Sequence, residues 1–251
     1  MQPDVDGQVR ILRLLAGGFL RNVIRESSLT CSTCTTPIEP CYERCYACAN
    51  RSNGMADIVV PLTYGIAGSQ SGLMMRQYKD DSSAAVRERH ALILSWLLAV
   101  GINLHQRCIS RLVGQPITQM LTIPSSGGRQ GVHPFFRIAS ELKAVTASPA
   151  LSRTGIPVGS REVTIDRFAI EPESSRFDGQ HVLLLDDTWT TGSRTQSAVL
   201  RLRAAGAEHV SVMVGARWIE PKYADNSAFI ASRLTADYDP HICPVTGGVC
   251  P

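Results

Sequence analysis

The stretch His181-Val-Leu-Leu-Leu-Asp-Asp-Thr-Trp-Thr-Thr-Gly-Ser-Arg-Thr195 decides how the chain is interpreted. Its aliphatic run predicts a fully buried strand of a parallel sheet over residues 181–185. Two carboxylates follow at the end of that strand, and ligands of open α/β sheets bind beyond the carboxyl ends of the strands. A Thr/Gly/Ser turn then leads into a helix predicted over residues 194–205. The stretch therefore predicts a ligand site on a strand, a loop and a helix.

Residues 182–197 suit a sugar phosphate. The helix N-terminus offers unpaired backbone N–H groups and a positive dipole end, which can hold phosphate. Asp186 and Asp187 lie one loop away, where they can accept hydrogen bonds from two sugar hydroxyls. A phosphate beside a vicinal diol predicts a ribose 5-phosphate, although a strand end followed by an ordinary helix cap is the alternative. The candidate phosphate ligands are Thr188, Thr190, Thr191, Gly192 and Ser193.

Residues 183–193 resemble the signature of the type I phosphoribosyltransferases, which is a hydrophobic strand, two acids and a Thr-Thr-Gly turn. The resemblance implies an α/β fold with a Rossmann-like, mainly parallel sheet flanked by helices. It implies that Asp186 and Asp187 are the catalytic pair, which holds the ribose hydroxyls of 5-phosphoribosyl pyrophosphate (PRPP). Residues 188–193 would hold its 5-phosphate. Trp189 stands where the family usually has a small or aliphatic residue.

A second loop, Ser125 to Gly131, follows a strand predicted over residues 117–124. Its small residues and single arginine suit an anion, although a flexible surface loop is the alternative. The family places its pyrophosphate loop in such a position, so pyrophosphate is expected at Ser125, Ser126, Gly127 and Arg129. Mg²⁺ bound with PRPP would neutralise the charge of the leaving pyrophosphate. Lys79 is a further candidate anion contact, against the alternative of a solvated face.

Two cysteine pairs, Cys31-x-x-Cys34 and Cys45-x-x-Cys48, are separated by ten residues. Each pair can present two thiolates to one tetrahedral ion, so the spacing predicts a structural Zn²⁺ site. Cys41 is an alternative ligand in place of Cys45 or Cys48. A redox pair is the competing interpretation.

Further cysteines lie outside this segment. His241, Cys243 and Cys250 could hold a second metal, Cys243 and Cys250 could pair, or both cysteines could be incidental. Cys108 falls within a helical pattern, which predicts a small buried hydrophobe.

A cysteine segment followed by a phosphoribosyltransferase-like domain resembles the competence protein F family, which is amidophosphoribosyltransferase-like and linked to DNA uptake. The resemblance covers residues 31–48, 78–79, 124–131 and 186–193. The chain departs from the family at residues 125–128, where Ser-Ser-Gly-Gly replaces a more basic stretch, and in its cysteine-containing C-terminus.

The composition limits the class of protein and the partners to be expected. The 251 residues are 44% apolar and 19% charged, as in a globular protein, and the net charge of +3 does not favour a nucleic-acid coat. The N-terminus has no basic signal region, and the uncharged apolar run 91–104 is shorter than the roughly 20 residues that span a bilayer. We therefore expect a cytoplasmic protein without a membrane partner.

Alternating strands and helices from residue 57 onward favour a mainly parallel α/β sheet. We expect an N-terminal helix and cysteine segment over 1–52, a phosphoribosyltransferase-like domain over 53–220 and a C-terminal extension over 221–251. The expected helices are 8–26, 83–111 as one helix or as two divided at Gly101, 134–145 and 194–205. The expected strands are 57–61, followed by a loop with Gly65, Gly68 and Gly72, then 117–124, 161–170 as one strand or two, 181–185 and 208–216.

The predicted activity is transfer of the 5-phosphoribosyl group from PRPP to a small-molecule nitrogen nucleophile, with release of pyrophosphate. The segment that selects the acceptor is expected in the N-terminal region, in residues 148–167 or in residues 217–218. A non-catalytic PRPP sensor is one alternative. Another is a nucleic-acid module, less favoured, that uses Tyr42, Arg44, Tyr46 and Arg51. A homodimer is left open.

Overall fold

A parallel sheet forms the centre of the computed structural model, which describes residues 3–51, 54–124, 133–142, 145–146 and 148–251. Its strand order within these residues is β1-β6-β5-β2, with every neighbouring pair parallel. The strands are β1 (Val59–Ile66), β2 (Gln119–Thr122), β5 (His181–Trp189) and β6 (His209–Ile219). An antiparallel pair, β3 (Ala150–Arg153) with β4 (Phe168–Glu171), forms a second small sheet.

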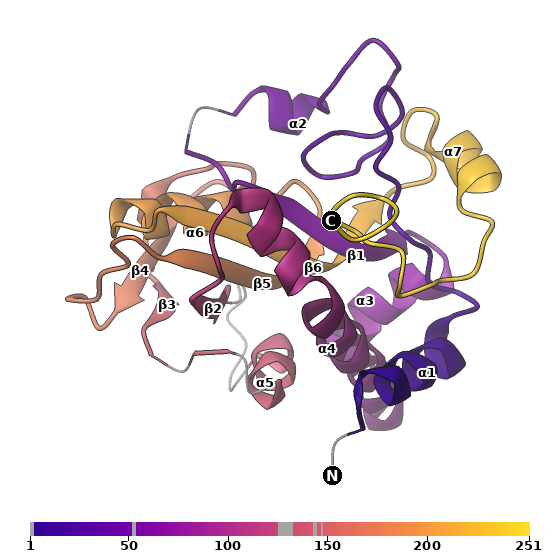
Figure 1. Ribbon diagram of the computed structural model, residues 1–251, viewed down its shortest axis with the longest axis horizontal. Coiled ribbons are helices and arrows are strands. Elements are labelled where there is room, and N and C mark those ends of the chain that lie inside the picture. The colour runs from indigo at the N-terminus through magenta and orange to yellow at the C-terminus, as the bar shows by residue number, and fades with distance from the viewer. Residues whose placement is uncertain (1–2, 52–53, 125–132, 143–144, 147) are drawn as a thin grey trace.

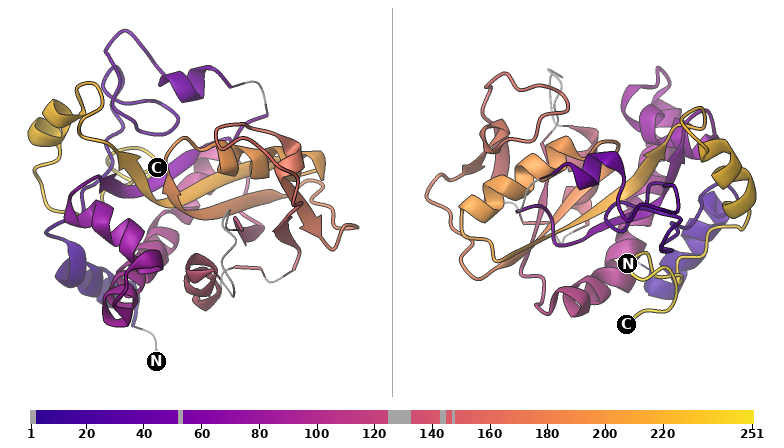
Figure 2. Two further views of the ribbon diagram at one scale, coloured as in Figure 1. Left: turned by 180° about the vertical axis from the view of Figure 1, so that it is seen from behind. Right: turned by 90° about the horizontal axis from the view of Figure 1, so that it is seen from above.

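Helices cover both faces of the central sheet (Figures 1 and 2). One face packs against α1 (Val5–Ala16), α3 (Gln70–Asp80), α4 (Ala84–Val113) and α5 (Pro134–Glu141). The other packs against α6 (Ser193–Ala204) and the cysteine segment, which contains α2 (Tyr46–Ala49). The short helix η1 (Ile165–Arg167) precedes β4, and α7 (Asn226–Arg233) follows β6. The predicted α/β class, with a sheet flanked by helices and a small N-terminal cysteine segment, is confirmed.

Side chains of β5 alternate between these layers, as the period of two in a strand requires. Leu183 and Leu185 belong to the core beneath α4. Val182 and Leu184 belong to the core beneath α6. The same alternation sends the next two side chains of the strand to opposite faces.

Helix α4 is one continuous helix and is not divided at Gly101. Gly101 packs directly on Leu62 of β1, where a Cβ atom would overlap the leucine side chain. By length and composition alone α4 could cross a membrane. In this fold its buried residues, among them Leu94 and Leu97, pack in the main core.

Several predicted bounds were wrong. The first helix ends at Ala16 and not at residue 26, because Gly17 and Gly18 follow and glycine is a poor helix former. The chain then runs beside β1, where the N–H group of Arg21 donates to Thr63 Oγ1 at 3.0 Å. The loop expected to contain Gly65, Gly68 and Gly72 is shorter, because Gly65 belongs to β1, Gly72 belongs to α3 and only residues 67–69 lie between these elements. Of the residues 161–170 predicted as strand, only 168–170 lie in one, because 165–167 form η1. The other predicted helices and strands differ mostly at their ends.

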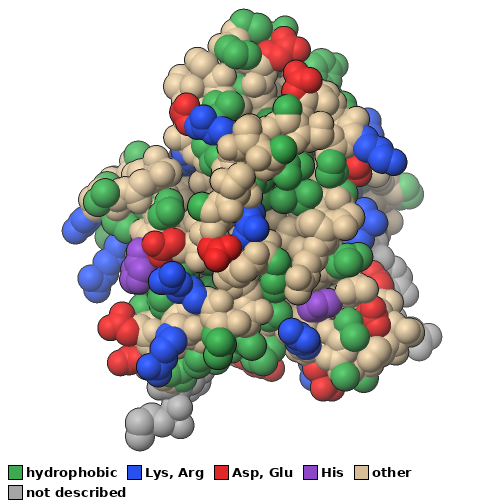
Figure 3. All heavy atoms as spheres, turned by 90° about the vertical axis from the view of Figure 1, so that its right-hand side faces the viewer, with side chains coloured by type: hydrophobic (Ala, Val, Ile, Leu, Met, Phe, Trp, Pro, Cys, Tyr) green, Lys and Arg blue, Asp and Glu red, His purple; other side chains and the backbone are tan. Residues whose placement is uncertain are grey.

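The carboxyl ends of the strands face the side of the molecule on which α7 lies, since β6 leads into that helix (Figure 1). Figure 3 turns this side to the viewer and shows hydrophobic side chains gathered in a recess near its centre.

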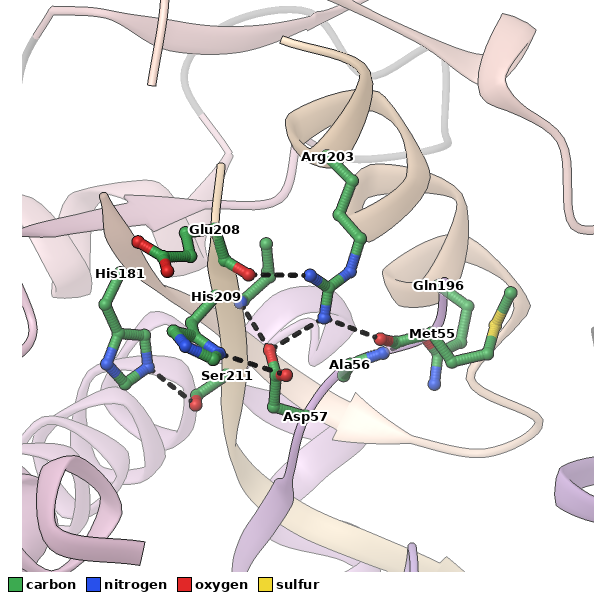
Figure 4. Close-up of polar contacts among 10 residues, drawn as sticks. Met55, Ala56, Asp57, His181, Gln196, Arg203, Glu208, His209 and Ser211 are labelled. Atoms are coloured by element: carbon green, nitrogen blue, oxygen red, sulfur yellow. Dashed lines mark hydrogen bonds and ion pairs between the residues drawn. The ribbon is translucent and has the colours of Figure 1, made fainter. Parts of the chain in front are cut away.

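The amino ends of the strands are joined by a polar network (Figure 4). The Asp57 carboxylate accepts hydrogen bonds from Arg203 Nη2 at 2.8 Å, His209 Nδ1 at 3.2 Å and the N–H group of Val210 at 2.7 Å. His181 Nε2 lies 2.8 Å from Ser211 Oγ. These contacts fix β1, β5, β6 and α6 relative to one another at the edge opposite the recess.

Candidate functional site

Both predicted acids lie on β5 itself, because the strand continues past residue 185 to Trp189. Asp186 and Asp187 are each 5% exposed. Asp186 follows the alternation toward α6, where its Oδ2 accepts a hydrogen bond from Thr195 Oγ1 at 3.2 Å. The two carboxylates therefore stand on opposite faces of one strand and can contact different parts of one ligand.

Asp187 faces α3. Its Oδ2 accepts a hydrogen bond from the Tyr78 hydroxyl and forms an ion pair with the Lys79 ammonium. The structure thus brings Lys79, a candidate from the sequence, against one of the two candidate acids. Tyr78 was not among the predicted site residues.

The two acids differ in their proton affinity. Burial raises the pKa of Asp186 to about 6, although Arg194 acts in the opposite direction. Burial also opposes ionisation of Asp187, but Lys79 and Tyr78 outweigh it and hold the pKa of Asp187 below its ordinary value. Near pH 6 one carboxylate is therefore fully charged while the other still exchanges its proton.

The turn after β5 is shaped by Gly192, which has a φ of 73° and caps the N-terminus of α6. Glycine tolerates this left-handed conformation, whereas other residues adopt it at a cost. The ring of Trp189 lies directly beneath Gly192, so a Cβ atom there would overlap the indole. Trp189 is 1% exposed and forms the floor of the turn, a role that its sequence position alone did not reveal.

Two arginines hold the carbonyl groups of the turn. Arg217 Nη1 donates to the carbonyl of Thr190 at 2.8 Å, and Arg51 donates to the carbonyl of Thr191. The C=O and N–H groups of a trans peptide point in opposite directions. The N–H groups of Thr191 and Gly192 consequently point away from the arginines, and neither donates to any residue that the structure describes. The turn presents them as free donors.

The hydroxyl groups of the turn differ in availability. Thr188 is partly exposed and Thr190 is exposed. Ser193 Oγ already donates to the carbonyl of Ser160 at 2.8 Å and lies 3.2 Å from Thr191 Oγ1. The hydroxyl of Ser193 therefore fixes the turn, while its backbone belongs to the helix N-terminus.

The predicted pyrophosphate contacts Ser125, Ser126, Gly127 and Arg129 lie outside the described residues. The loop that contains them follows β2. Strand β2 pairs with β5, so the end of β2 lies beside Asp186 and Asp187. From there β2 leads to α5 on one face of the sheet, and β5 leads to α6 on the other. Such a switch point leaves a crevice in which ligands of α/β sheets bind.

Arg194, on the first turn of α6, lies at this crevice. Its Nη2 donates to the carbonyl of Pro124 at 2.9 Å, and its buried Nε has no hydrogen-bond partner among the described residues. A buried donor without a partner is costly unless a ligand or water completes it. Sequence reasoning missed Arg194 because only the β2–β5 pairing places it beside Asp186.

Four thiols of the cysteine segment gather at one point. The sulfur atoms of Cys31, Cys34, Cys45 and Cys48 lie within 4.8 Å of one another. Cys34 Sγ and Cys45 Sγ are 3.7 Å apart, close to the edge of about 3.8 Å expected for a tetrahedron with Zn–S bonds of about 2.3 Å. Cys41 is exposed and outside the group. These four cysteines fit a structural metal ion such as Zn²⁺.

The cysteine segment also supports the turn. Arg217 Nε donates to Thr36 Oγ1 at 2.5 Å, while its Nη1 holds the turn. One buried guanidinium thus joins the thiol cluster, β6 and the turn after β5. No local pattern around Arg217 signals this role.

A cavity of about 840 Å³ lies between the cysteine segment, the turn and the end of β6. Its walls include apolar, aromatic and basic side chains. Thr190 and Thr191 of the turn line it, whereas Asp186 and Asp187 are not among its lining residues. Residues of its lining include Tyr46, Arg51, Arg161, Val163, Thr190, Thr191, Arg217, Trp218 and Tyr223.

No protein-family model matches the chain, and no curated protein matches it. Among solved structures it is similar to a purine phosphoribosyltransferase from Pyrococcus horikoshii Ot3, at 14% identity and a TM-score of 0.27, over 51% of this chain and 90% of that one. It is also similar to a hypoxanthine phosphoribosyltransferase from Staphylococcus aureus, at 13% identity and a TM-score of 0.29, over 49% of this chain and 74% of that one.

Proposed function

We propose that this chain binds PRPP in the crevice between β2 and β5 and transfers its phosphoribosyl group to a nitrogen nucleophile. The observation that carries the proposal is the juxtaposition of two carboxylates and an anion-binding turn on adjoining residues. Asp186 and Asp187 stand on opposite faces of the strand end, and the N–H groups of Thr191 and Gly192 are free immediately beyond them.

The 5-phosphate would lie on the turn. Backbone donors of Thr191 and Gly192, the positive end of the α6 dipole and the exposed Thr190 hydroxyl all favour an anion there. The ribose hydroxyls would donate to Asp186 and Asp187, because ionised carboxylates are strong acceptors. In this arrangement the phosphate contacts the donors of the turn and the ribose contacts both carboxylates.

The pyrophosphate would extend toward the loop that begins at Pro124. Lys79 and Arg194 supply positive charge on either side of the acids. Mg²⁺ chelated by the pyrophosphate would neutralise the charge that develops on it. In the reaction the bond from C1 to the pyrophosphate oxygen breaks, a C1–N bond forms and the nitrogen loses a proton. The protein contributes chiefly by positioning the two reactants.

The acceptor would occupy the cavity beside the turn. All three regions expected to select it contribute to the lining: Tyr46 and Arg51 from the N-terminal region, Arg161 and Val163, and Trp218 at the end of β6. Aromatic and apolar walls with a few cations favour a flat acceptor with a polar edge. The resemblance to the competence protein F family agrees with a cysteine segment beside a PRPP site, but it does not identify the acceptor.

Calorimetry with PRPP and Mg²⁺ tests the binding. We expect the wild type to bind, and Asp186→Ala/Asp187→Ala to lose affinity about 100-fold or more, since each charge-assisted hydrogen bond contributes about 1.5–3 kcal/mol. Asp237→Ala removes an exposed carboxylate and serves as the matched control. Wild-type protein that fails to bind PRPP, or a double variant that binds it equally well, contradicts the proposal. A pyrophosphate-release screen over bases, amines and ammonia then separates an enzyme from a sensor.

A second candidate function is handling of single-stranded nucleic acid by the cysteine segment. The observation that favours it is the exposure of Tyr42 (59%) and Tyr46 (85%) beside Arg44, because exposed rings can stack on bases. A mobility-shift assay at rising salt tests it, with Tyr42→Ala/Tyr46→Ala as the variant. Binding that is absent at low salt, or unchanged in the variant, removes this candidate.

A further inference from the structure

A second cluster of metal-ligating side chains lies away from the proposed PRPP site. His105 and Cys108 are one turn apart on α4 and share a helix face. Cys243 and Cys250 come from the C-terminal tail, more than a hundred residues later. The ligand atoms of these four residues all lie within 4.8 Å of one another.

The spacing within the cluster suits a tetrahedral ion. With Zn–S bonds of about 2.3 Å and a Zn–N bond of about 2.0 Å, a sulfur and a nitrogen ligand should be about 3.6 Å apart. His105 Nδ1 and Cys250 Sγ are separated by 3.6 Å. A disulfide would require a sulfur–sulfur distance of about 2.05 Å, and all cysteines of the cluster are free.

The orientation of His105 is fixed by its other nitrogen. Nε2 lies 2.9 Å from the carbonyl oxygen of Pro240. A carbonyl oxygen can only accept, so Nε2 carries the proton and Nδ1 of the neutral ring keeps its lone pair. That lone pair faces the cysteines. Metal-ligating histidines are commonly held in this way by a backbone carbonyl.

The tail forms a closed turn that brings its two cysteines to α4. The N–H group of Cys243 donates to the carbonyl of Gly248 at 2.8 Å, and that of Gly247 donates to the carbonyl of Cys243 at 2.8 Å. Residues 235–251 contain no helix or strand. A segment of this kind gains much of its order from a metal ion, since the ligands are brought together only in the folded state.

Burial distinguishes this cluster from scattered surface residues. His105 is 2% exposed, Cys108 4% and Cys243 0%, whereas Cys250 is exposed. Three thiols and one imidazole form a soft donor set that selects Zn²⁺ over Mg²⁺ or Ca²⁺. Four protein ligands leave no position open for a substrate, as in structural sites.

One arginine connects the two clusters. Arg25 Nη1 donates to the carbonyl of Ser32, between Cys31 and Cys34, at 3.1 Å. Its Nε donates to the carbonyl of Pro244, next to Cys243, at 2.6 Å. The tail turn is therefore positioned against α4 and against the first cysteine cluster together.

We propose that His105, Cys108, Cys243 and Cys250 form a second structural Zn²⁺ site, which attaches the C-terminal tail to α4. This site is independent of PRPP binding. It replaces the grouping of His241 with Cys243 and Cys250 suggested by their proximity in the sequence, because His241 is exposed and outside the cluster. Cys108, expected to be only a small hydrophobe, becomes a ligand.

Zinc content measured by elemental analysis and native mass spectrometry tests the proposal. The wild type should carry two Zn²⁺ per chain. Cys31→Ser/Cys34→Ser and His105→Gln should each carry one, and the combined variant none. Glutamine can still donate to the Pro240 carbonyl but lacks the ring nitrogen that faces the cluster. Cys41→Ser and His241→Gln alter exposed residues outside both clusters and should retain two.

X-ray absorption gives a readout that does not depend on variants of the first cluster. The two sites together supply seven sulfur ligands and one nitrogen, so the wild-type spectrum should average 3.5 sulfur ligands and 0.5 nitrogen per Zn²⁺. If His105→Gln does not fold, Cys250→Ser replaces it, because Cys250 is exposed at the end of the tail. That variant should release one Zn²⁺ to a chelator faster than the wild type.

A single Zn²⁺ in the wild type, with an all-sulfur shell, overturns the proposal. So does a mass lower by two hydrogens that locates a disulfide among Cys108, Cys243 and Cys250. Two Zn²⁺ ions that both persist in His105→Gln and in Cys250→Ser, with unchanged release, also overturn it.

Discussion

Lys79 of α3 forms an ion pair with Asp187 at the carboxyl end of β5. The two residues are far apart in sequence, and only the packing of α3 on the sheet brings them together. The ammonium keeps a buried carboxylate charged, and it lies where the leaving pyrophosphate of the proposed substrate would pass. The Lys79–Asp187 contact stabilises the folded protein, and the proposed PRPP site would use the same ammonium to attract pyrophosphate.

Lys79→Met should weaken PRPP binding about tenfold or more. Loss of the cation raises the pKa of the buried Asp187 and removes positive charge from the pyrophosphate path. Calorimetry at pH 7.5 with Mg²⁺ measures the change. Lys222→Met, which removes an exposed ammonium, is the control and should bind as the wild type does. Equal affinity of Lys79→Met and the control would show that Lys79 does not contribute.

Affinity for PRPP should fall as the pH drops through about 6. Burial raises the pKa of Asp186 to about 6, and the protonated acid is a weaker acceptor for a ribose hydroxyl. Titration of the ligand's own phosphate also weakens binding in this range, so the wild type must be compared with Asp186→Asn. The variant should bind more weakly throughout and keep only the dependence of the ligand. Identical pH profiles would contradict an acceptor role for Asp186.

Asp186→Asn should also stabilise the protein against unfolding at pH 7.5. The folded-state pKa of Asp186 lies above its ordinary value, so folding favours its protonated form. Its contribution to stability is greatest below the ordinary pKa and is lost as the pH rises to about 6. Removing the buried charge should yield on the order of 2 kcal/mol at pH 7.5 and little at pH 4. Urea unfolding at both pH values measures this, and a variant that loses stability at pH 7.5 would disprove the expectation.

Gly192→Ala should destabilise the turn and impair PRPP binding. The residue has a positive φ, and its new Cβ atom would overlap the Trp189 ring. Strain of this kind costs on the order of 1–3 kcal/mol. Gly18→Ala introduces a methyl group where no atom lies within 4 Å, and should be nearly neutral in thermal unfolding. Similar unfolding midpoints for both variants would argue against this account of the turn.

The sequence predicted those parts of the fold that depend on local patterns. The aliphatic run, the two acids and the Thr-Thr-Gly turn located β5 and the start of α6 to within a few residues. The two C-x-x-C pairs identified four side chains that do gather, because each pair positions its own sulfurs. In both cases the relevant residues are close in sequence.

The parts that could not be predicted depend on contacts between distant segments. No helix was predicted over Gln70–Asp80 because polar residues interrupt its apolar pattern, and its helical form depends on burying Met74 and Tyr78 in the core. Arg217 supports the turn across a strand pair, and no local pattern distinguishes it from an ordinary surface arginine. His105 likewise meets Cys250 only because the tail returns to α4.

The hydrogen bonds of Arg25 to Ser32 and Pro244 imply an order of folding during synthesis, because the two partners lie near opposite ends of the chain. During synthesis the first cysteine cluster leaves the ribosome long before residue 244 is translated. Until the tail emerges, the Arg25 guanidinium lacks one of its three carbonyl partners, since it also donates to the carbonyl of Val59. The N-terminal segment can therefore form early, but its hydrogen bonds are complete only after the C-terminal turn has packed against it. The last step of folding thus takes place beside the first cysteine cluster.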